Sequence, residues 1–118
     1  MWACVSQRYC APCFRLSRWF DDNHDVLKKD FVILKIDELR NANGHRVADR
    51  LLRGQRHGFP YHAIFDQHET MLVDSAGLFG NIGAPSRFEG RKQLAKMLAT
   101  SKQQLNDIEI QGLLNTIE

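Results

Sequence analysis

Two of the chain's three cysteines, Cys10 and Cys13, stand three residues apart, with Ala11 and Pro12 between them. This Cys-x-x-Cys spacing lets the two sulfurs either close a disulfide or share a metal ion. A structural zinc site needs two further ligands at matching spacing, and the chain has no second Cys-x-x-Cys and no His-x-x-x-His pair. We therefore favour redox chemistry and expect neither a metal nor an organic cofactor.

The cysteine pair lies where an expected strand gives way to an expected helix. Residues 2–6 are apolar and β-prone, which favours a buried strand. Pro12 suits the first turn of a helix, where its missing N–H costs nothing. Apolar residues then recur at helical spacing, so we expect this helix to run to about Lys29. Cys10 would lie at its N-cap, where unpaired N–H groups and the helix dipole favour a thiolate and lower the thiol pKa.

The two thiols therefore have different expected roles. Cys10 is the expected nucleophile, which attacks a substrate disulfide and forms a mixed disulfide. Cys13, deeper in the helix, is the expected resolving thiol. It attacks the mixed disulfide, releases the reduced substrate and closes the Cys10–Cys13 bridge.

The rest of the chain predicts a mixed sheet with helices on both faces. The apolar run Phe31–Asp37 predicts a second, central strand covered on both faces, as in a parallel sheet. A helix ending near Gly54 follows, and residues 61–66 and 70–74 predict an antiparallel hairpin. The order strand, helix, strand, helix, hairpin, helix predicts an α/β fold with a β-α-β unit followed by a β-β-α unit.

The C-terminal half predicts a loop and two helices. Residues 75–85 contain three glycines and no periodicity, so we expect a long surface loop. Ser86 and Glu89 have the spacing of a capping box, which would begin a helix. Residues 106–118 are compatible with a short amphipathic helix packed on the body.

Length and composition limit the possible classes of protein. With 118 residues, 43% of them hydrophobic, we expect one domain over 1–118, with a core at about 2–100 and a helical extension at about 102–118. The net charge of +2 is not concentrated in a basic stripe, so we expect no nucleic-acid partner. No stretch approaches the roughly 20 apolar residues of a membrane span.

We accordingly expect a soluble monomer. Residues 1–8 have neither the basic leader nor the small-residue cleavage site of a signal peptide. The pattern is compatible with a cytoplasmic protein and equally with an exported one whose leader is absent from this chain. The compartment stays open.

Four features together resemble the thioredoxin family: a strand, the aromatic-Cys-Ala-Pro-Cys segment at residues 9–13 that opens a helix, the strand at 31–37, and Gly58-Phe59-Pro60 before a hairpin. The resemblance covers about residues 2–100. Residues 58–66 and 80–85 also resemble a bacterial thioredoxin-like branch of the family.

This resemblance implies a thioredoxin fold and a redox-active Cys10–Cys13 disulfide. It also implies that Pro60 is a cis-proline facing the disulfide and that the Phe59 backbone pairs with the substrate polypeptide. Without it a trans bond would be expected, because only about 5–6% of X-Pro bonds in folded proteins are cis. The expected partners are protein disulfides and a redox partner, either a reductant or an oxidant. The expected substrate-binding residues are Tyr9, Ala11, Pro12, Phe59 and Pro60.

The sequence departs from the thioredoxin pattern at three positions. Thioredoxins usually carry a buried aspartate on the strand before the motif, and the matching residue here is Cys4. The route by which the resolving thiol loses its proton is therefore open. Tyr9 replaces a common tryptophan, and Ala11 replaces a common glycine. The Ala11-Pro12 dipeptide weakly favours a reductant over an oxidant or isomerase.

Several other residues have both a functional and a plainer interpretation. On a buried strand Cys4 is most often an inert small hydrophobe, which we favour over a regulatory thiol. His57 and His62 flank the Gly-Phe-Pro turn, where an imidazolium would favour a thiolate. We favour instead a solvated loop histidine and an outward-facing strand histidine. Arg8, close to Cys10, is expected to be an ordinary surface arginine.

The favoured function is a thiol-disulfide oxidoreductase that acts on protein disulfides through Cys10 and Cys13. The alternative is a non-catalytic thioredoxin-fold binding module. It would hold a partner in a groove at residues 58–60 and with the loop at 75–85, and its cysteine pair would be inert. Neither the direction of exchange nor the identity of the clients follows from the sequence.

Overall fold

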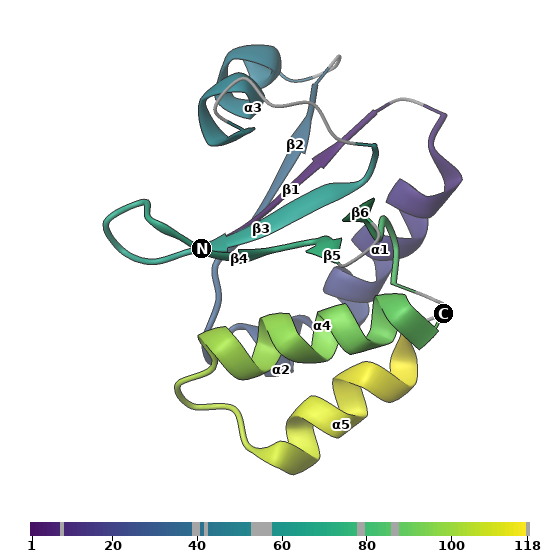
Figure 1. Cartoon of the computed structure of the whole chain (residues 1–118), viewed down its shortest axis with the longest axis vertical. Coiled ribbons are helices and arrows are strands. Elements are labelled where there is room, and N and C mark those ends of the chain that lie inside the picture. The colour runs from purple at the N-terminus through teal and green to yellow at the C-terminus, as the bar shows by residue number, and fades with distance from the viewer. Residues whose placement is uncertain are drawn as a thin grey trace.

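A computed structural model describes residues 1–7, 9–38, 41, 43–52, 58–77, 80–85 and 88–117. Four strands form a mixed sheet in the order β2-β1-β3-β4 (Figure 1). Strand β1 (Trp2–Ser6) runs parallel to β2 (Ile33–Asp37) and antiparallel to β3 (Tyr61–Phe65), which pairs antiparallel with β4 (Met71–Asp74). The predicted β1 strand and the β3–β4 hairpin are confirmed.

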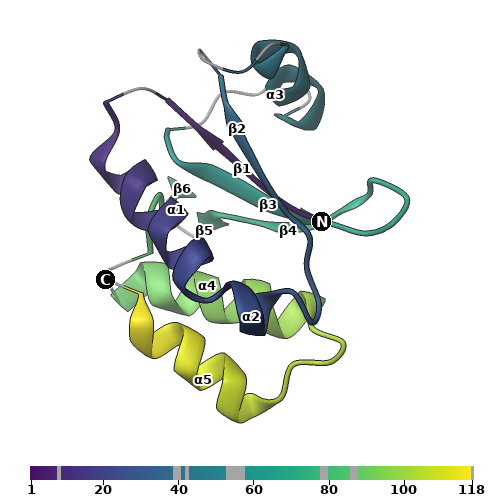
Figure 2. The ribbon, with the colours of Figure 1, turned by 180° about the vertical axis from the view of Figure 1, so that it is seen from behind.

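Helices cover both faces of this sheet, as the sequence predicted (Figures 1 and 2). One face carries α1 (Ala11–Asp22), α2 (His24–Leu27), α4 (Phe88–Ser101) and α5 (Asp107–Thr116). The other face carries α3 (Gly44–Leu52) against the β1–β2 side of the sheet. This arrangement is the mixed α/β architecture expected of a thioredoxin-like fold.

The larger core lies between the sheet and the four helices of the first face. Successive side chains of a strand point to opposite faces, so Trp2 and Cys4 enter this core while Ala3 and Val5 face the other side. Because β1 is central and covered on both faces, its whole apolar run is buried. The fully buried side chains of the larger core include those of Trp2, Leu16, Phe20, Leu27, Ile64, Leu94, Met97, Leu98, Leu113 and Ile117.

The prediction that the Phe31–Asp37 strand is central is wrong, because β2 is an edge of the sheet. Leu34 and Lys35 are exposed, and Val32, just before the strand, is 74% exposed. The pairing explains the difference: β1 pairs with both β2 and β3, so β1 takes the inner position and β2 has a neighbour on one side only. A continuous apolar run indicates a strand, but it does not show how many strands will pair with it.

The single helix predicted to about Lys29 is interrupted at Asn23, whose backbone leaves the helical region. The Asn23 side-chain nitrogen donates to the Trp19 carbonyl at 2.9 Å and to Thr116 Oγ1 at 3.2 Å. The side chain thereby occupies a helix carbonyl and ties the end of α1 to α5. The apolar periodicity continues through the break into α2, so it could not reveal the interruption.

The segment predicted as a surface loop instead contains two short strands and several buried residues. Strands β5 (Ala76–Gly77) and β6 (Gly80–Asn81) form a small antiparallel sheet, and Ser75 before them is fully buried. Strands of two residues are too short to show a period of two, so the sequence pattern missed them. Two further predictions depend on residues outside the described part of the chain. They are the capping box, through Ser86, and the helix end near Gly54.

The C-terminal segment packs against α1 and the turn that follows α2. The indole nitrogen of Trp19 donates to the Leu113 carbonyl of α5 at 3.1 Å. Asp30 accepts three backbone N–H bonds at 2.7–3.0 Å, from Gln103, Gln104 and Leu105 in the α4–α5 connection. Burial alone would raise the pKa of the Asp30 carboxyl, but the three donors outweigh it and lower the pKa. The predicted C-terminal helix is therefore confirmed and closely attached.

Candidate active site

The candidate site begins with a disulfide between Cys10 and Cys13 at the N-terminus of α1, where the two Cα atoms lie 5.2 Å apart. Cys10 is the N-cap residue, with an extended backbone, and its Sγ accepts the Cys13 N–H at 3.2 Å. Pro12 lies in the first turn, where no intrahelical N–H bond is lost. The local sequence therefore begins the helix at the position that places both sulfurs at its positive end.

The two sulfurs differ in their access to solvent. Cys10 is half-buried, whereas Cys13 is 5% exposed. Tyr9, with a positive φ of 62°, and Phe14 are 87% and 63% exposed and place aromatic surface beside the disulfide. An approaching partner therefore meets Cys10 first and finds exposed aromatic rings next to it.

The second part of the site is the loop that leads into β3. The peptide bond between Phe59 and Pro60 is cis. The Pro60 ring is buried close to Gly83, where an added Cβ would lie 3.6 Å from Pro60 Cδ. Phe59 is half-buried, and within the described part of the chain its backbone N–H and C=O form no hydrogen bond. Neither backbone group is therefore used by an intramolecular hydrogen bond there.

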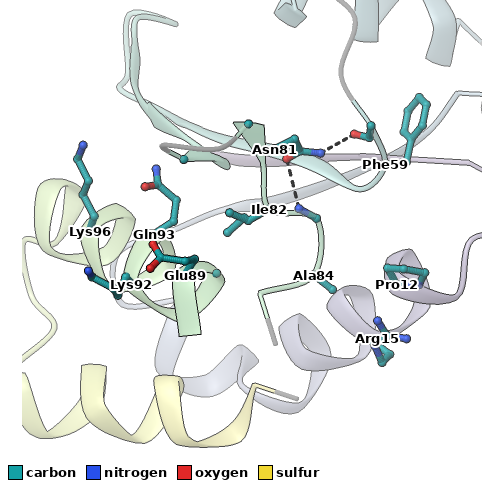
Figure 3. Close-up of a pocket in the computed structure, with 15 residues that line it drawn as sticks. Pro12, Arg15, Phe59, Asn81, Ile82, Ala84, Glu89, Lys92, Gln93 and Lys96 are labelled. Atoms are coloured by element: carbon teal, nitrogen blue, oxygen red, sulfur yellow. Dashed lines mark hydrogen bonds between the residues drawn. The ribbon is translucent and has the colours of Figure 1, made fainter. Parts of the chain in front are cut away.

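An open groove of about 920 Å³ joins these two parts (Figure 3). Its walls come from the start of α1 with Pro12 and Arg15, from Gly58 and Phe59, from the β5–β6 region, and from α4. Figure 3 shows Lys92 and Lys96 on α4 across the groove from α1. Of the predicted site residues, Pro12 and Phe59 line this groove, Pro60 lies buried beside it, and Tyr9 and Ala11 are exposed next to the disulfide.

His62 lies buried in the core, contrary to the prediction of an outward-facing strand histidine. It is fully buried, accepts the Trp2 indole N–H at Nδ1 (3.1 Å) and donates from Nε2 to the Gly83 carbonyl (3.3 Å). Burial lowers the pKa of His62 to about 4, so the ring is neutral at physiological pH. Since β3 is buried on both faces, the sequence pattern could not show that this polar residue points inward.

A family model described as thioredoxin-like matches residues 1–67, more than half of the 118 residues. The chain belongs to the thioredoxin-like family. No curated protein and no solved structure matches it. The matched part of this thioredoxin-like chain contains β1, the cysteine pair, α1, β2 and the cis-proline loop.

The position where thioredoxins usually carry a buried aspartate holds Cys4 in this thioredoxin-like protein. Cys4 is 4% exposed and pairs with His62 across the β1–β3 ladder. Desolvation raises the pKa of the Cys4 thiol to about 12, against a smaller opposing effect of the Lys35 charge. Cys4 is therefore protonated at neutral pH and agrees with the interpretation of an inert apolar residue. Arg8 and His57 lie outside the described residues.

Two polar residues that contact the cis-proline loop or support that contact, Asn81 and Ser75, were not predicted from the sequence. Asn81 donates to backbone carbonyls of that loop, and the hydroxyl of the fully buried Ser75 donates to Asn81. The available signal was the resemblance of residues 80–85 to the bacterial branch of the family, which does not by itself assign a role to Asn81.

Neither a metal cluster nor a membrane helix is present in the described part of the chain. No three or more His, Cys, Asp or Glu side chains gather there as a metal ion would require. Nor is any helix there long and apolar enough to cross a membrane.

Proposed function

We propose that this thioredoxin-like protein is a thiol-disulfide oxidoreductase that reduces or exchanges protein disulfides through Cys10 and Cys13. One observation carries the proposal: the pair forms a disulfide at a helix N-terminus, with Cys10 the more exposed sulfur, beside an open groove. The pair itself holds the two electrons that are exchanged, so the proposed reaction uses no metal or organic cofactor.

In the reducing direction, the first step forms a mixed disulfide. The Cys10 thiolate attacks one sulfur of the substrate disulfide, the substrate S–S bond breaks, and one substrate thiolate leaves. The positive end of α1 favours the Cys10 thiolate. The Cys13 N–H points at Cys10 Sγ in the disulfide form and is placed to donate to the thiolate after reduction.

The second step releases the substrate. Cys13 loses its proton and attacks Cys10 Sγ, the mixed disulfide breaks, and the second substrate thiolate leaves. Burial raises the pKa of the Cys4 thiol to about 12, so Cys4 is already protonated at neutral pH. It therefore cannot accept the proton of Cys13. In this scheme the first substrate thiolate accepts the Cys13 proton and becomes a thiol. The substrate gains two electrons, and a dithiol partner must restore the reduced pair; the oxidising direction reverses these steps.

Two single substitutions test this scheme. Cys10→Ser should abolish the reduction of insulin disulfides, because the attacking sulfur is gone. The assay supplies a small thiol that regenerates the reduced protein after each turnover. Cys13→Ser should accumulate a mixed disulfide with insulin, because the resolving attack is lost. Mass spectrometry detects this adduct, and an added thiol reduces it. Full activity of Cys10→Ser would overturn the mechanism. A wild-type protein that binds reduced peptides in the groove but reduces no disulfide would favour the binding module instead.

A further inference from the structure

The side chain of Asn81, at the end of β6, forms two hydrogen bonds to the cis-proline loop. Its Nδ2 donates to the Gly58 carbonyl at 2.6 Å and to the Pro60 carbonyl at 3.0 Å. Figure 3 shows the first of these bonds reaching the loop beside Phe59. The two bonded carbonyls belong to the residues on either side of Phe59, whose own backbone groups form no hydrogen bond in the described part of the chain.

The orientation of the Asn81 amide is itself determined by two donors. Its Oδ1 accepts the Ser75 hydroxyl at 2.5 Å and the Gly83 N–H at 3.4 Å. A reversed amide would set Oδ1 against the carbonyls of Gly58 and Pro60, so the observed orientation is the one that satisfies every partner. All hydrogen-bonding positions of this side chain are therefore used.

Ser75 connects this amide to the buried core. Its side chain is fully buried, and its Oγ accepts the backbone N–H of His62 at 3.1 Å while donating to Asn81. The Ser75 N–H donates to the His62 carbonyl at 2.8 Å, which extends the β3–β4 pairing to this point. The amide is thus attached to the central sheet rather than to a mobile surface residue.

We propose that Asn81 is a positioning residue that fixes the two peptide groups around Phe59, so that the free N–H and C=O of Phe59 meet the substrate backbone in one geometry. Holding these groups before binding reduces the conformational freedom that the loop loses when a polypeptide pairs with it. The proposal rests on the proposed function, because it assigns Asn81 to the recognition of the polypeptide that carries the target disulfide.

This role predicts that losing Asn81 affects substrates unequally. A protein disulfide presents a backbone to Phe59, whereas hydroxyethyl disulfide has none. The informative quantity is therefore the ratio of kcat/KM for insulin to kcat/KM for hydroxyethyl disulfide. General damage to the fold or to the thiol pair would lower both values and leave the ratio near its wild-type value.

The sharpest variant is Asn81→Asp, which keeps the acceptor for Ser75 and Gly83 but replaces the Nδ2 donor with oxygen. We expect the ratio to fall about tenfold or more, because two hydrogen bonds to the loop are lost and two carbonyls face a carboxylate. The loss should lie mainly in KM for insulin. Asn81→Ala should also lower the ratio, because it loses the same two hydrogen bonds.

Asn23→Ala is the matched control, because Asn23 is also a half-buried asparagine whose amide bridges two acceptors, but at the far end of α1. Its ratio should equal that of the wild type. If the Asn81 variants do not fold, Ser75→Ala decides, because it removes the hydroxyl that orients the amide. It should lower the ratio below that of the wild type, by less than about tenfold, since the two bonds from Nδ2 can still form. A wild-type ratio in the folded variants would overturn the proposal. A wild-type protein inactive on both substrates would contradict the proposed function instead.

Discussion

The N-terminus of α1 and the centre of β1 each carry cysteine, and they place it in opposite environments. Cys10 caps a helix, is half-buried and accepts a backbone N–H at 3.2 Å. Cys4 is 4% exposed among apolar side chains, and burial raises its thiol pKa to about 12. The difference predicts that position, through access and local charge, makes the Cys10 thiol reactive and leaves the Cys4 thiol inert.

The same contrast applies to polar groups. Near the helix N-terminus, Pro12 and Phe59 line an open groove, and the backbone groups of Phe59 form no hydrogen bond within the described part of the chain. On β3, opposite Cys4, the His62 ring has both nitrogens occupied, by the Trp2 indole and by the Gly83 carbonyl. Under the proposed function the first region meets another molecule, whereas the polar groups of the second are already paired within the protein.

The largest expected effect is in thiol alkylation. In the reduced native protein at neutral pH, Cys10 should react with iodoacetamide at least about a thousandfold faster than Cys4, because a thiol with a pKa near 12 is almost entirely protonated and is also shielded. Peptide mass spectrometry over time measures both rates. In denaturant the two cysteines should react alike. Comparable rates in the native protein would break the contrast between the two regions.

A smaller effect is expected from acid, through His62. The folded-state pKa of about 4 lies below the unfolded value of 6.5, so the unfolded chain binds the proton more readily. Stability should therefore fall as the pH drops from about 6.5 towards 4, with a contribution on the order of 2 kcal/mol between pH 7 and pH 4.5. Urea unfolding at the two pH values measures it.

His62→Asn provides the comparison for this measurement. Asparagine does not titrate and retains an oxygen that can accept the Trp2 indole N–H, so the variant should be less stable at pH 7 but should lose less stability on acidification. An equal loss in both proteins would show that other groups cause the acid sensitivity.

The smallest effect is expected from Cys4→Ala. The variant should reduce insulin within about twofold of the wild-type rate, because Cys4 takes no part in the proposed exchange. Its unfolding free energy should fall by about 1 kcal/mol, since one buried sulfur is removed from a packed core. A large loss of activity without a matching loss of stability would place Cys4 in the proton route of Cys13.

Local signals in the sequence were enough for much of the fold and for the cysteine pair. The apolar run at 2–6, the proline after Cys10 and the turn at 67–69 each act within a few residues, and they predicted β1, the start of α1 and the β3–β4 hairpin. The edge position of β2 and the inward direction of His62 depend on which strands pair across long sequence separations. Asn81 was missed for the same reason, since its acceptors at Gly58 and Pro60 lie more than 20 residues earlier.

The attachment of α5 to α1 also gives the protein a built-in optical signal. Trp19 donates its indole N–H to Leu113 of α5, and its ring centroid lies 5.9 Å from that of Trp2, whose own N–H binds His62. Trp2 and Trp19 are the only tryptophans of the chain. Its ultraviolet fluorescence would therefore respond both to detachment of the C-terminal helix and to disturbance of the core behind the cis-proline loop, without any added dye.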